Sequence, residues 1–229
     1  MPQLPGWMPE LLSLINQACL ESPMFARVDD EQVFQTARAV CLSLWPFIRD
    51  LPDNIACVRA KTPFQSEAAE KFFAHLADEE RVFQQLYRKQ CRLAGISDDQ
   101  LENVVPSAEP TLLSQVMQKH CRAENYLDGV LAIITAELGA AAWSRNAQPI
   151  FENYFAKHID RFDLAQVEDG LQWLRLHAKP NLKHAIWLRK LLDDFAFAPQ
   201  DKMPEPVREI LGALKSALMS EERESVKTI

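Results

Sequence analysis

Two glutamates lie on helix faces that the sequence predicts to be buried. Glu137, in VLAIITAELGAAAW, is the only charged residue of a stretch that is apolar nearly all round, and such a helix belongs in the centre of a bundle. Glu80, in AHLADEERVFQQLY, falls between Leu76 and Phe83 on the apolar stripe of its segment. Because an unpaired buried charge is costly, each carboxyl group must be protonated, paired with a cation or bound to a metal ion.

Two of the five histidines share one face of a third predicted helix. His177 and His184 are seven residues apart, which is two helical turns, and Asn181 lies between them in LRLHAKPNLKHAIWL. Pro180 disfavours helical backbone in the residue before it, so we expect the helix to kink or restart there. Carboxylates and imidazoles that converge from three helices of a bundle typically hold non-haem iron or manganese and leave positions open for O₂.

Each of these residues also has a purely structural interpretation. Glu80 could pair with an arginine at the margin of its stripe, Glu137 could be a hydrogen-bonded buried acid, and the two histidines could be structural or exposed. Asp78, Glu79 and Arg81 fall outside the apolar stripe, so we expect them to point outward as solvated charges.

Helices must position these groups, and the composition predicts an all-α protein. Leucine and alanine number 55 against 23 for valine and isoleucine, a bias toward helix formers. The six glycines never lie closer than ten residues to one another, so the chain has no glycine-rich phosphate loop, and we expect no nucleotide cofactor. Any chemistry must come from side chains that project inward from helices. Gly139, two residues after Glu137, is expected to let another helix or a ligand come close.

The helical periodicity predicts one compact bundle of seven to eight helices. Gly95 is expected to end the third long segment, Ser97 to cap the next one, and Pro52 and Pro63 to bracket a short irregular or helical connection. We interpret residues 1–229 as a single domain with a core at about 30–195, a C-terminal amphipathic helix at 207–219 and a polar tail at 220–229. The predicted helical segments are 9–20, 30–47, 66–93, 98–104, 110–144 with a bend near Gly129, 147–162, 166–178, 182–195 and 207–219.

Charge and cysteine content restrict the partners and the compartment. The net charge is −7 and the basic residues form no dense cluster, so we expect no nucleic-acid partner. The longest nearly apolar stretch, 130–143, is too short to span a membrane, and the first residues lack the basic region of a signal peptide. Five cysteines without a CxxC pair predict reduced thiols and a cytoplasmic protein. An apolar helix face is compatible with a homodimer.

The order and spacing of these residues resemble the haem-oxygenase-like diiron oxidases, the iron-containing redox branch of the TenA/PqqC-like superfamily. That family is a seven-helix bundle with a Glu followed by a His on one core helix (ExxH in some members), a lone Glu on the next, and HxxxDxxH on a third. The likeness covers about residues 45–194. Here the three places read Glu80-Arg81-Val82-Phe83, then Glu137, then His177-Ala-Lys-Pro-Asn181-Leu-Lys-His184.

Two of the six ligand positions of the family are substituted. Phe83 stands at the ExxH histidine, or Tyr87 does if the histidine belongs two turns after the glutamate, and neither replaces an imidazole. Asn181 stands at the aspartate, where its carbonyl oxygen is a weaker, uncharged ligand. His75, five residues before Glu80, is expected to be a partly exposed bystander, with a minor alternative as the replacement ligand.

The resemblance implies an iron-dependent oxidase or oxygenase that uses O₂ on a small organic substrate in a mostly apolar pocket. The implied ligands of mono- or dinuclear iron are Glu80, Glu137, His177 and His184, with Asn181 as a weak ligand. Phe83 and Tyr87 are implied to line the substrate pocket. No haem is expected, because the first helix has no axial histidine.

Three other functions remain as alternatives. A non-catalytic ligand-binding or partner protein would have lost the metal, with Phe83 packed where the metal would sit and Glu137 paired with an Arg or His. A TenA-like thiaminase needs a nucleophilic cysteine, whereas Cys121 is expected to be a small buried hydrophobe. A metal-free oxidase like PqqC needs a ring of His, Arg and Tyr, and the chain has only three tyrosines.

Overall fold

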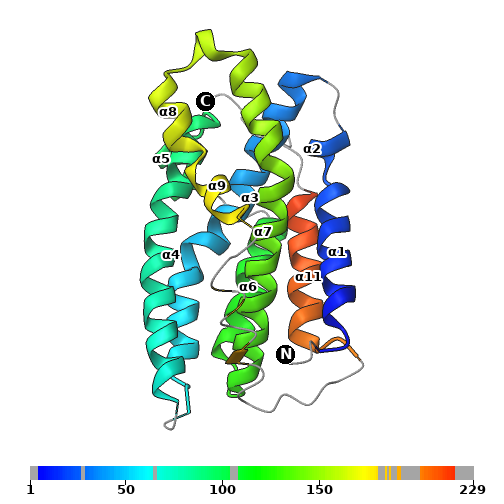
Figure 1. The fold of residues 1–229 in the computed structure, drawn as a ribbon, viewed down its shortest axis with the longest axis vertical. Helices are drawn as coiled ribbons and strands as arrows, with labels where there is room; N and C mark the ends of the chain where they lie inside the picture. The colour runs from blue at the N-terminus through cyan, green and yellow to red at the C-terminus, as the bar shows by residue number, and fades with distance from the viewer. Residues whose placement is uncertain are drawn as a thin grey trace.

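The protein is a bundle of helices (Figure 1). The computed structural model describes residues 5–26, 29–63, 66–103, 108–179 and 202–219, together with 184, 186, 190 and 191. These residues form helices and no strand, which confirms the all-α prediction. The helices are α1 (Met8–Leu20), α2 (Pro23–Ala26), α3 (Asp30–Arg59), α4 (Glu67–Leu93), α5 (Asp98–Glu102), α6 (Ala108–Arg122), α7 (Tyr126–Lys157), η1 (Ile159–Arg161), α8 (Leu164–Gly170), α9 (Gln172–His177) and α11 (Glu205–Leu218).

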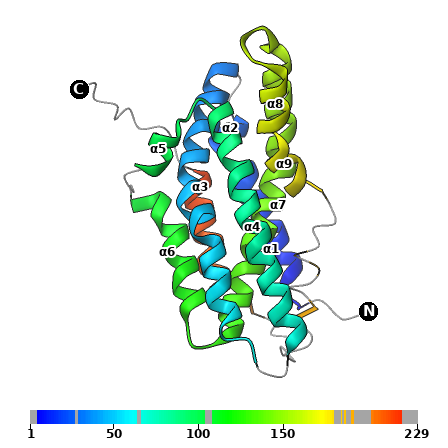
Figure 2. The ribbon, with the colours of Figure 1, turned by 90° about the vertical axis from the view of Figure 1, so that its left-hand side faces the viewer.

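The long helices run along the length of the bundle, with α7 in contact with most of the others (Figure 1). It packs against α1, α3, α6, α9 and α11. On another side, α3 lies between α4 and α6 (Figure 2). Because α7 is surrounded, nearly all of its side chains between Val130 and Ser144 are removed from water.

The helix predicted at 30–47 is much longer in the structure. It begins where the Asp29 side chain accepts hydrogen bonds from the backbone N–H groups of the first turn, and it continues as α3 to Arg59. Pro46 and Pro52 lie inside it, although proline removes a backbone donor and disfavours a helix interior. Both prolines are buried, and α3 packs along α4 and α6. Tertiary packing therefore outweighs the local preference, and of the irregular or helical connection predicted between Pro52 and Pro63 the helical alternative holds as far as Arg59, as part of α3 itself.

The helix predicted at 110–144 is two helices. The chain leaves α6 at Arg122, and Asn125 starts α7 by accepting a hydrogen bond from Leu127 N at 3.2 Å. No bend at Gly129 is needed, because the chain has already turned; the missing side chain instead lets α7 approach Val58 of α3. The separate helix predicted at 147–162 is also wrong, since α7 continues through the exposed Pro149 to Lys157 and only the short η1 follows.

Other predicted boundaries agree with the structure. Gly95 adopts the left-handed conformation, with φ of 74°, just after α4, and Ile96 N bonds to Cys91 O across it. Ser97 caps α5 in a reciprocal hydrogen-bond pair with Gln100. The segment predicted at 166–178 is divided at Leu171 into α8 and α9. The predicted tail and most of 182–195 lie outside the described residues.

The central helix α7 is long and apolar enough, by length and composition alone, to cross a membrane, contrary to the prediction for 130–143. However, 78% of its most apolar window is buried inside the fold, which is typical of the core helix of a soluble protein. Gly139 lies on this helix where an added Cβ would meet Leu214 of α11 at 2.6 Å. As expected, the glycine allows another helix to approach.

Candidate metal centre

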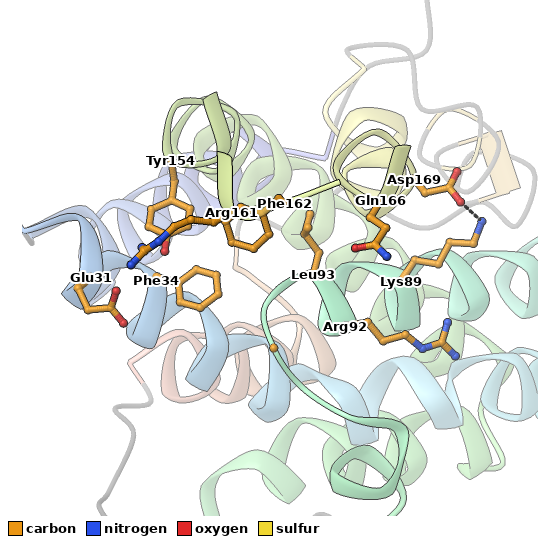
Figure 3. Close-up of a pocket in the computed structure, with 11 residues that line it drawn as sticks. Glu31, Phe34, Lys89, Arg92, Leu93, Tyr154, Arg161, Phe162, Gln166 and Asp169 are labelled. Carbon is orange, nitrogen blue, oxygen red and sulfur yellow. Dashed lines mark hydrogen bonds and ion pairs between the residues drawn. The ribbon is translucent and has the colours of Figure 1, made fainter. Parts of the chain in front are cut away.

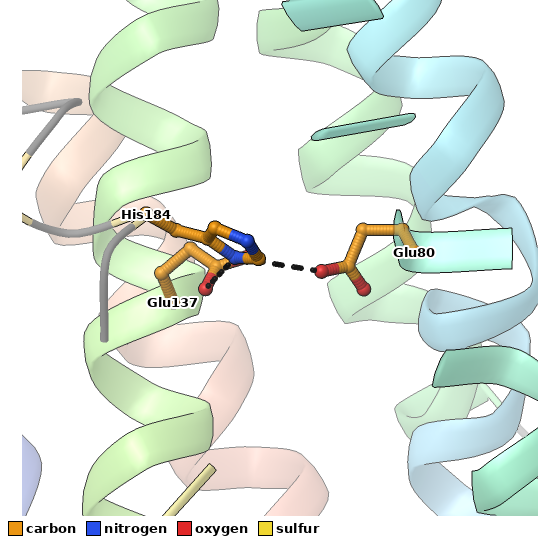
Figure 4. A group of neighbouring side chains, drawn as sticks. All are labelled: Glu80, Glu137 and His184. Carbon is orange, nitrogen blue, oxygen red and sulfur yellow. Dashed lines mark hydrogen bonds and ion pairs between the residues drawn. The ribbon is translucent and has the colours of Figure 1, made fainter. Parts of the chain in front are cut away.

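Three of the predicted ligands meet in the interior. Glu80 comes from α4, Glu137 from α7, and His184 from the segment that follows α9 (Figure 4). One ligand atom from each lies within 4.8 Å of the others. His184 Nδ1 is 3.3 Å from Glu137 Oε2 and 3.8 Å from Glu80 Oε1. These are distances at which a small cation could contact all three groups after minor adjustment.

Burial makes the protonation states of this group unusual. Glu80 and Glu137 are each 4% exposed and His184 is 7% exposed. Burial first, and the charge of Glu137 next, raise the pKa of Glu80 well above its usual value. Burial alone would lower the pKa of an imidazole, but the hydrogen bond and charge of Glu137 outweigh it and raise the pKa of His184 to about 9. Without a metal, the centre is balanced by protons on His184 and Glu80.

One carboxylate oxygen in this group has no hydrogen-bond partner among the described residues. It is Glu80 Oε1, a fully buried atom 3.8 Å from His184 Nδ1. A buried polar atom without a partner costs folding free energy, and a bound ion is one reason for a protein to keep such an atom. Two hard oxygen donors and one imidazole are the donor types that iron and manganese bind. The three side chains therefore fit a divalent metal ion, whose binding would displace the protons.

Glu79 is part of the same network, and the prediction that it is only a solvated charge is wrong. Its Oε2 accepts a hydrogen bond from His184 Nε2 at 2.8 Å and lies 3.4 Å from His75 Nε2. The His75 side chain is 71% exposed and Glu79 is 38% exposed, so Glu79 links the buried centre to the surface. Periodicity could not reveal this, because Glu79 lies beside the apolar stripe and only the three-dimensional position of His184 brings them together.

His177 is not among the three residues whose ligand atoms converge, although it lies near enough to Glu137 and His184 for their charges to influence its pKa. It is buried, its Nδ1 is 2.9 Å from the carbonyl oxygen of Trp173, and its ring stacks on that indole at 4.2 Å. Burial lowers the pKa of His177. Phe83 contacts both imidazoles, with ring centroids 5.0 Å from His177 and 6.0 Å from His184. A phenyl ring thus lies beside both histidines that the sequence assigns to iron.

The other predicted site residues have separate roles or positions. Tyr87 is fully buried between Trp45 and Trp173, and its hydroxyl donates to the carbonyl oxygen of Cys41 at 3.0 Å. Asn181 lies outside the described residues. Cys121 is fully buried, and burial raises the pKa of its thiol to about 12, as expected for a small hydrophobe rather than a nucleophile.

A small apolar cavity adjoins the helix that carries Glu137. It has a volume of about 30 Å³, and its walls include Ala136, Gly139 and Ala140 of α7 together with Trp173 of α9. A space of this size holds one or two small molecules such as water or O₂, and not an organic substrate.

Comparisons with known proteins agree with the fold. A family model described as the TENA/THI-4/PQQC family matches residues 43–185. A TenA homologue from Pseudomonas syringae pv. tomato str. DC3000 superposes with a TM-score of 0.70 and 14% identity, over 93% of this chain and 91% of that one. A domain of unknown function with a haem-oxygenase-like fold, from Shewanella denitrificans OS217, superposes with a TM-score of 0.67 and 15% identity, over 95% of this chain and 88% of that one. No curated protein sequence matches the chain.

Proposed function

The chain belongs to the TENA/THI-4/PQQC family, and from this premise we propose that it is an iron-dependent oxidase or oxygenase that uses O₂ on a small organic substrate. Glu80, Glu137 and His184 hold one metal ion in this proposal. The observation that carries it is the buried group of two carboxylates and one imidazole, in which Glu80 Oε1 has no other described partner. His177 and Asn181 stay predicted as additional ligands.

The protein's own side chains prepare this centre in several ways. Glu137 and Glu80 supply the negative charge that a divalent cation needs, and both are held on packed helices. Glu79 accepts the Nε2 proton of His184, so that Nδ1 faces the two carboxylates. Phe83 fills space beside both imidazoles, which favours one metal over two. Bound iron would supply the redox chemistry that activates O₂.

A second function is favoured by a specific observation. The non-catalytic alternative predicts that Phe83 packs where the metal would sit and that Glu137 pairs with an Arg or His. The second arrangement occurs, since Glu137 contacts His184, and Phe83 lies beside both imidazoles. In that case the chain is a ligand-binding or partner protein whose centre is balanced by protons alone.

Elemental analysis separates the two functions. Protein purified from iron-supplemented cells should contain about one iron ion per chain. Glu137→Gln should reduce the iron to a trace, whereas Glu124→Gln, at an exposed position outside the centre, should not change it. Phe83→His combined with Asn181→Asp restores the substituted ligand types and should raise the iron content. Trace iron in the unaltered protein, with no gain in that double variant, would contradict the proposal.

The remaining expectations belong to the same proposal. We take the chain to be one cytoplasmic domain with a small-molecule substrate, no nucleic-acid partner, no membrane and a homodimeric state. The compartment and the partners rest on the acidic charge and the cysteine content of the sequence and on the burial of α7, and the homodimer rests on an apolar helix face.

A further inference from the structure

A second site lies in an open cleft far from the metal centre. The cleft has a volume of about 860 Å³ and is bordered by the start of α3, the end of α4, the end of α7 and the segment from η1 to α8 (Figure 3). Lys89 on its border is nine residues beyond Glu80 on α4, or about 14 Å along the helix. Tyr154 is seventeen residues beyond Glu137 on α7, or about 26 Å. A ligand here would not touch the metal centre.

An aromatic wall forms one side of the cleft. Phe34 stacks on Tyr154 with ring centroids 4.8 Å apart and planes at 11°. Phe162 meets Tyr154 at 6.4 Å, and Phe155 packs behind these rings from the core. These rings come from three segments and hold one another in place, so the wall is formed before any ligand binds. A flat apolar group would find a rigid surface there.

Most of the charges around the cleft already neutralise one another. Lys89 pairs with Asp169 at 2.9 Å, and Arg92 pairs with Asp98 at 2.7 Å. Such exposed pairs leave little net field for a ligand.

Two charges of opposite sign remain beside the aromatic wall. Arg161 and Glu31 lie near Tyr154 at the same end of the cleft (Figure 3). The Arg161 guanidinium lies close to the Tyr154 side chain, and the Glu31 carboxylate accepts a hydrogen bond from Gln35. Within the described part of the chain, neither takes part in an ion pair of its own. The wall is thus flanked by one cation and one anion that can still bind charged groups.

We infer that this cleft binds a small aromatic zwitterion, of the chemical class of the aromatic amino acids. Its carboxylate binds Arg161, its ammonium group binds Glu31, and its ring lies against Phe34 and Phe162. A guanidinium binds a carboxylate through two parallel hydrogen bonds, which suits the first contact. Because both charged side chains are exposed to water, binding should be weak, with a dissociation constant on the order of 1 mM. This inference does not depend on the metal.

Calorimetric and NMR titrations of the full-length protein with three indoles test the inference. L-tryptophan has both charges, tryptamine has only the ammonium group, and indole-3-propionate has only the carboxylate. L-tryptophan should bind about two- to fivefold more tightly than either analogue. In the NMR titration, the backbone amide chemical shifts of residues that line the cleft should change. Equal affinities for the three probes, or no binding of L-tryptophan at about 5 mM, would overturn the inference.

Matched variants test which group of the ligand each charged side chain binds. Arg161→Gln should remove the advantage of L-tryptophan over tryptamine, and Glu31→Gln should remove its advantage over indole-3-propionate. Arg145→Gln, at an exposed arginine of α7 outside the cleft, is the control and should leave all three affinities unchanged. Phe34→Leu should weaken all three probes together, with thermal melting used to verify that the variant is folded. If Arg161→Gln and Glu31→Gln behave like the control, the inference is wrong.

Discussion

The candidate metal centre and the cleft contain similar groups in opposite surroundings. In the metal centre, two carboxylates and an imidazole are almost completely buried, and their contacts shift the pKa values of Glu80 and His184. In the cleft, the charged side chains are largely exposed, and most of them pair with one another across the surface. Buried groups interact strongly because water does not screen them, whereas exposed ones do not. The centre is therefore suited to chemistry and the cleft to weak recognition.

The largest effect should come from removing one partner of the buried group. Glu137→Ala leaves the His184 imidazolium without its main counter-charge, which typically costs about 3 kcal/mol of unfolding free energy. Urea unfolding of the metal-free protein measures this, with Glu124→Ala as an exposed control. A loss below about 1 kcal/mol would mean that Glu80 ionises and replaces Glu137, and the contrast between buried and exposed charges would be weaker than we describe.

The pH dependence of stability should follow the same contrast. Because the folded protein raises the pKa of His184 from 6.5 to about 9, its stabilising contribution is complete below pH 6.5 and disappears as the pH rises through 9. The raised pKa of Glu80 acts in the same direction, beginning above its ordinary value of 4.5. Through His184, the free energy of unfolding of the metal-free protein should fall by roughly 3 kcal/mol between about pH 6 and about pH 10.

This prediction has an internal control. His184→Gln should flatten the pH dependence, whereas Arg161→Gln in the cleft should leave it unchanged. Stability that rises with pH across this range would show that His184 is neutral in the folded protein.

An intermediate effect is expected at Glu79, which links the buried metal centre to the protein surface. Glu79→Gln weakens the hydrogen bond that orients His184 and should reduce metal affinity about 10- to 100-fold. Asp78→Asn is the matched control, since Asp78 is exposed and pairs only with Arg81 among the described residues. Competition with a metal-binding dye gives the affinity, and ¹⁵N NMR of the metal-free protein reports the His184 protonation pattern. Equal metal affinity in both variants would show that Glu79 does not support metal binding through His184.

The smallest effect should be found at the cleft. Lys89→Gln removes an ion pair whose side chains are 39% and 52% exposed, so the free energy of unfolding should change by less than about 0.5 kcal/mol. Denaturant unfolding at low and high salt measures the change. A salt-insensitive loss larger than about 1 kcal/mol would show that the cleft is not the weakly coupled region described above.

The sequence was sufficient to predict that two glutamates are buried. Glu80 and Glu137 each interrupt an apolar helical face, and that periodicity is a local property of the chain. The all-α fold, the end of α4 and the start of α5 followed from similar local signals, such as Gly95 and Ser97. These predictions succeeded because a helix face and a helix cap involve residues close in sequence.

The errors came from interactions between distant segments. The sequence predicts that one helix ends at 47, before Pro52, and that another begins at 147, next to Pro149, yet packing carries α3 and α7 through both prolines. Glu79 was read as solvated because its partner His184 is 105 residues away. The cleft also joins residues from the start of α3 to α8, and no local pattern relates them.

Diffraction at the iron absorption edge from crystals grown with Fe(II) under anaerobic conditions tests the central claim most directly. A single anomalous peak should lie within coordination distance of Glu80, Glu137 and His184, with Phe83 beside it. No peak at these residues, while His184 still contacts Glu137, would contradict an iron centre and favour the non-catalytic alternative.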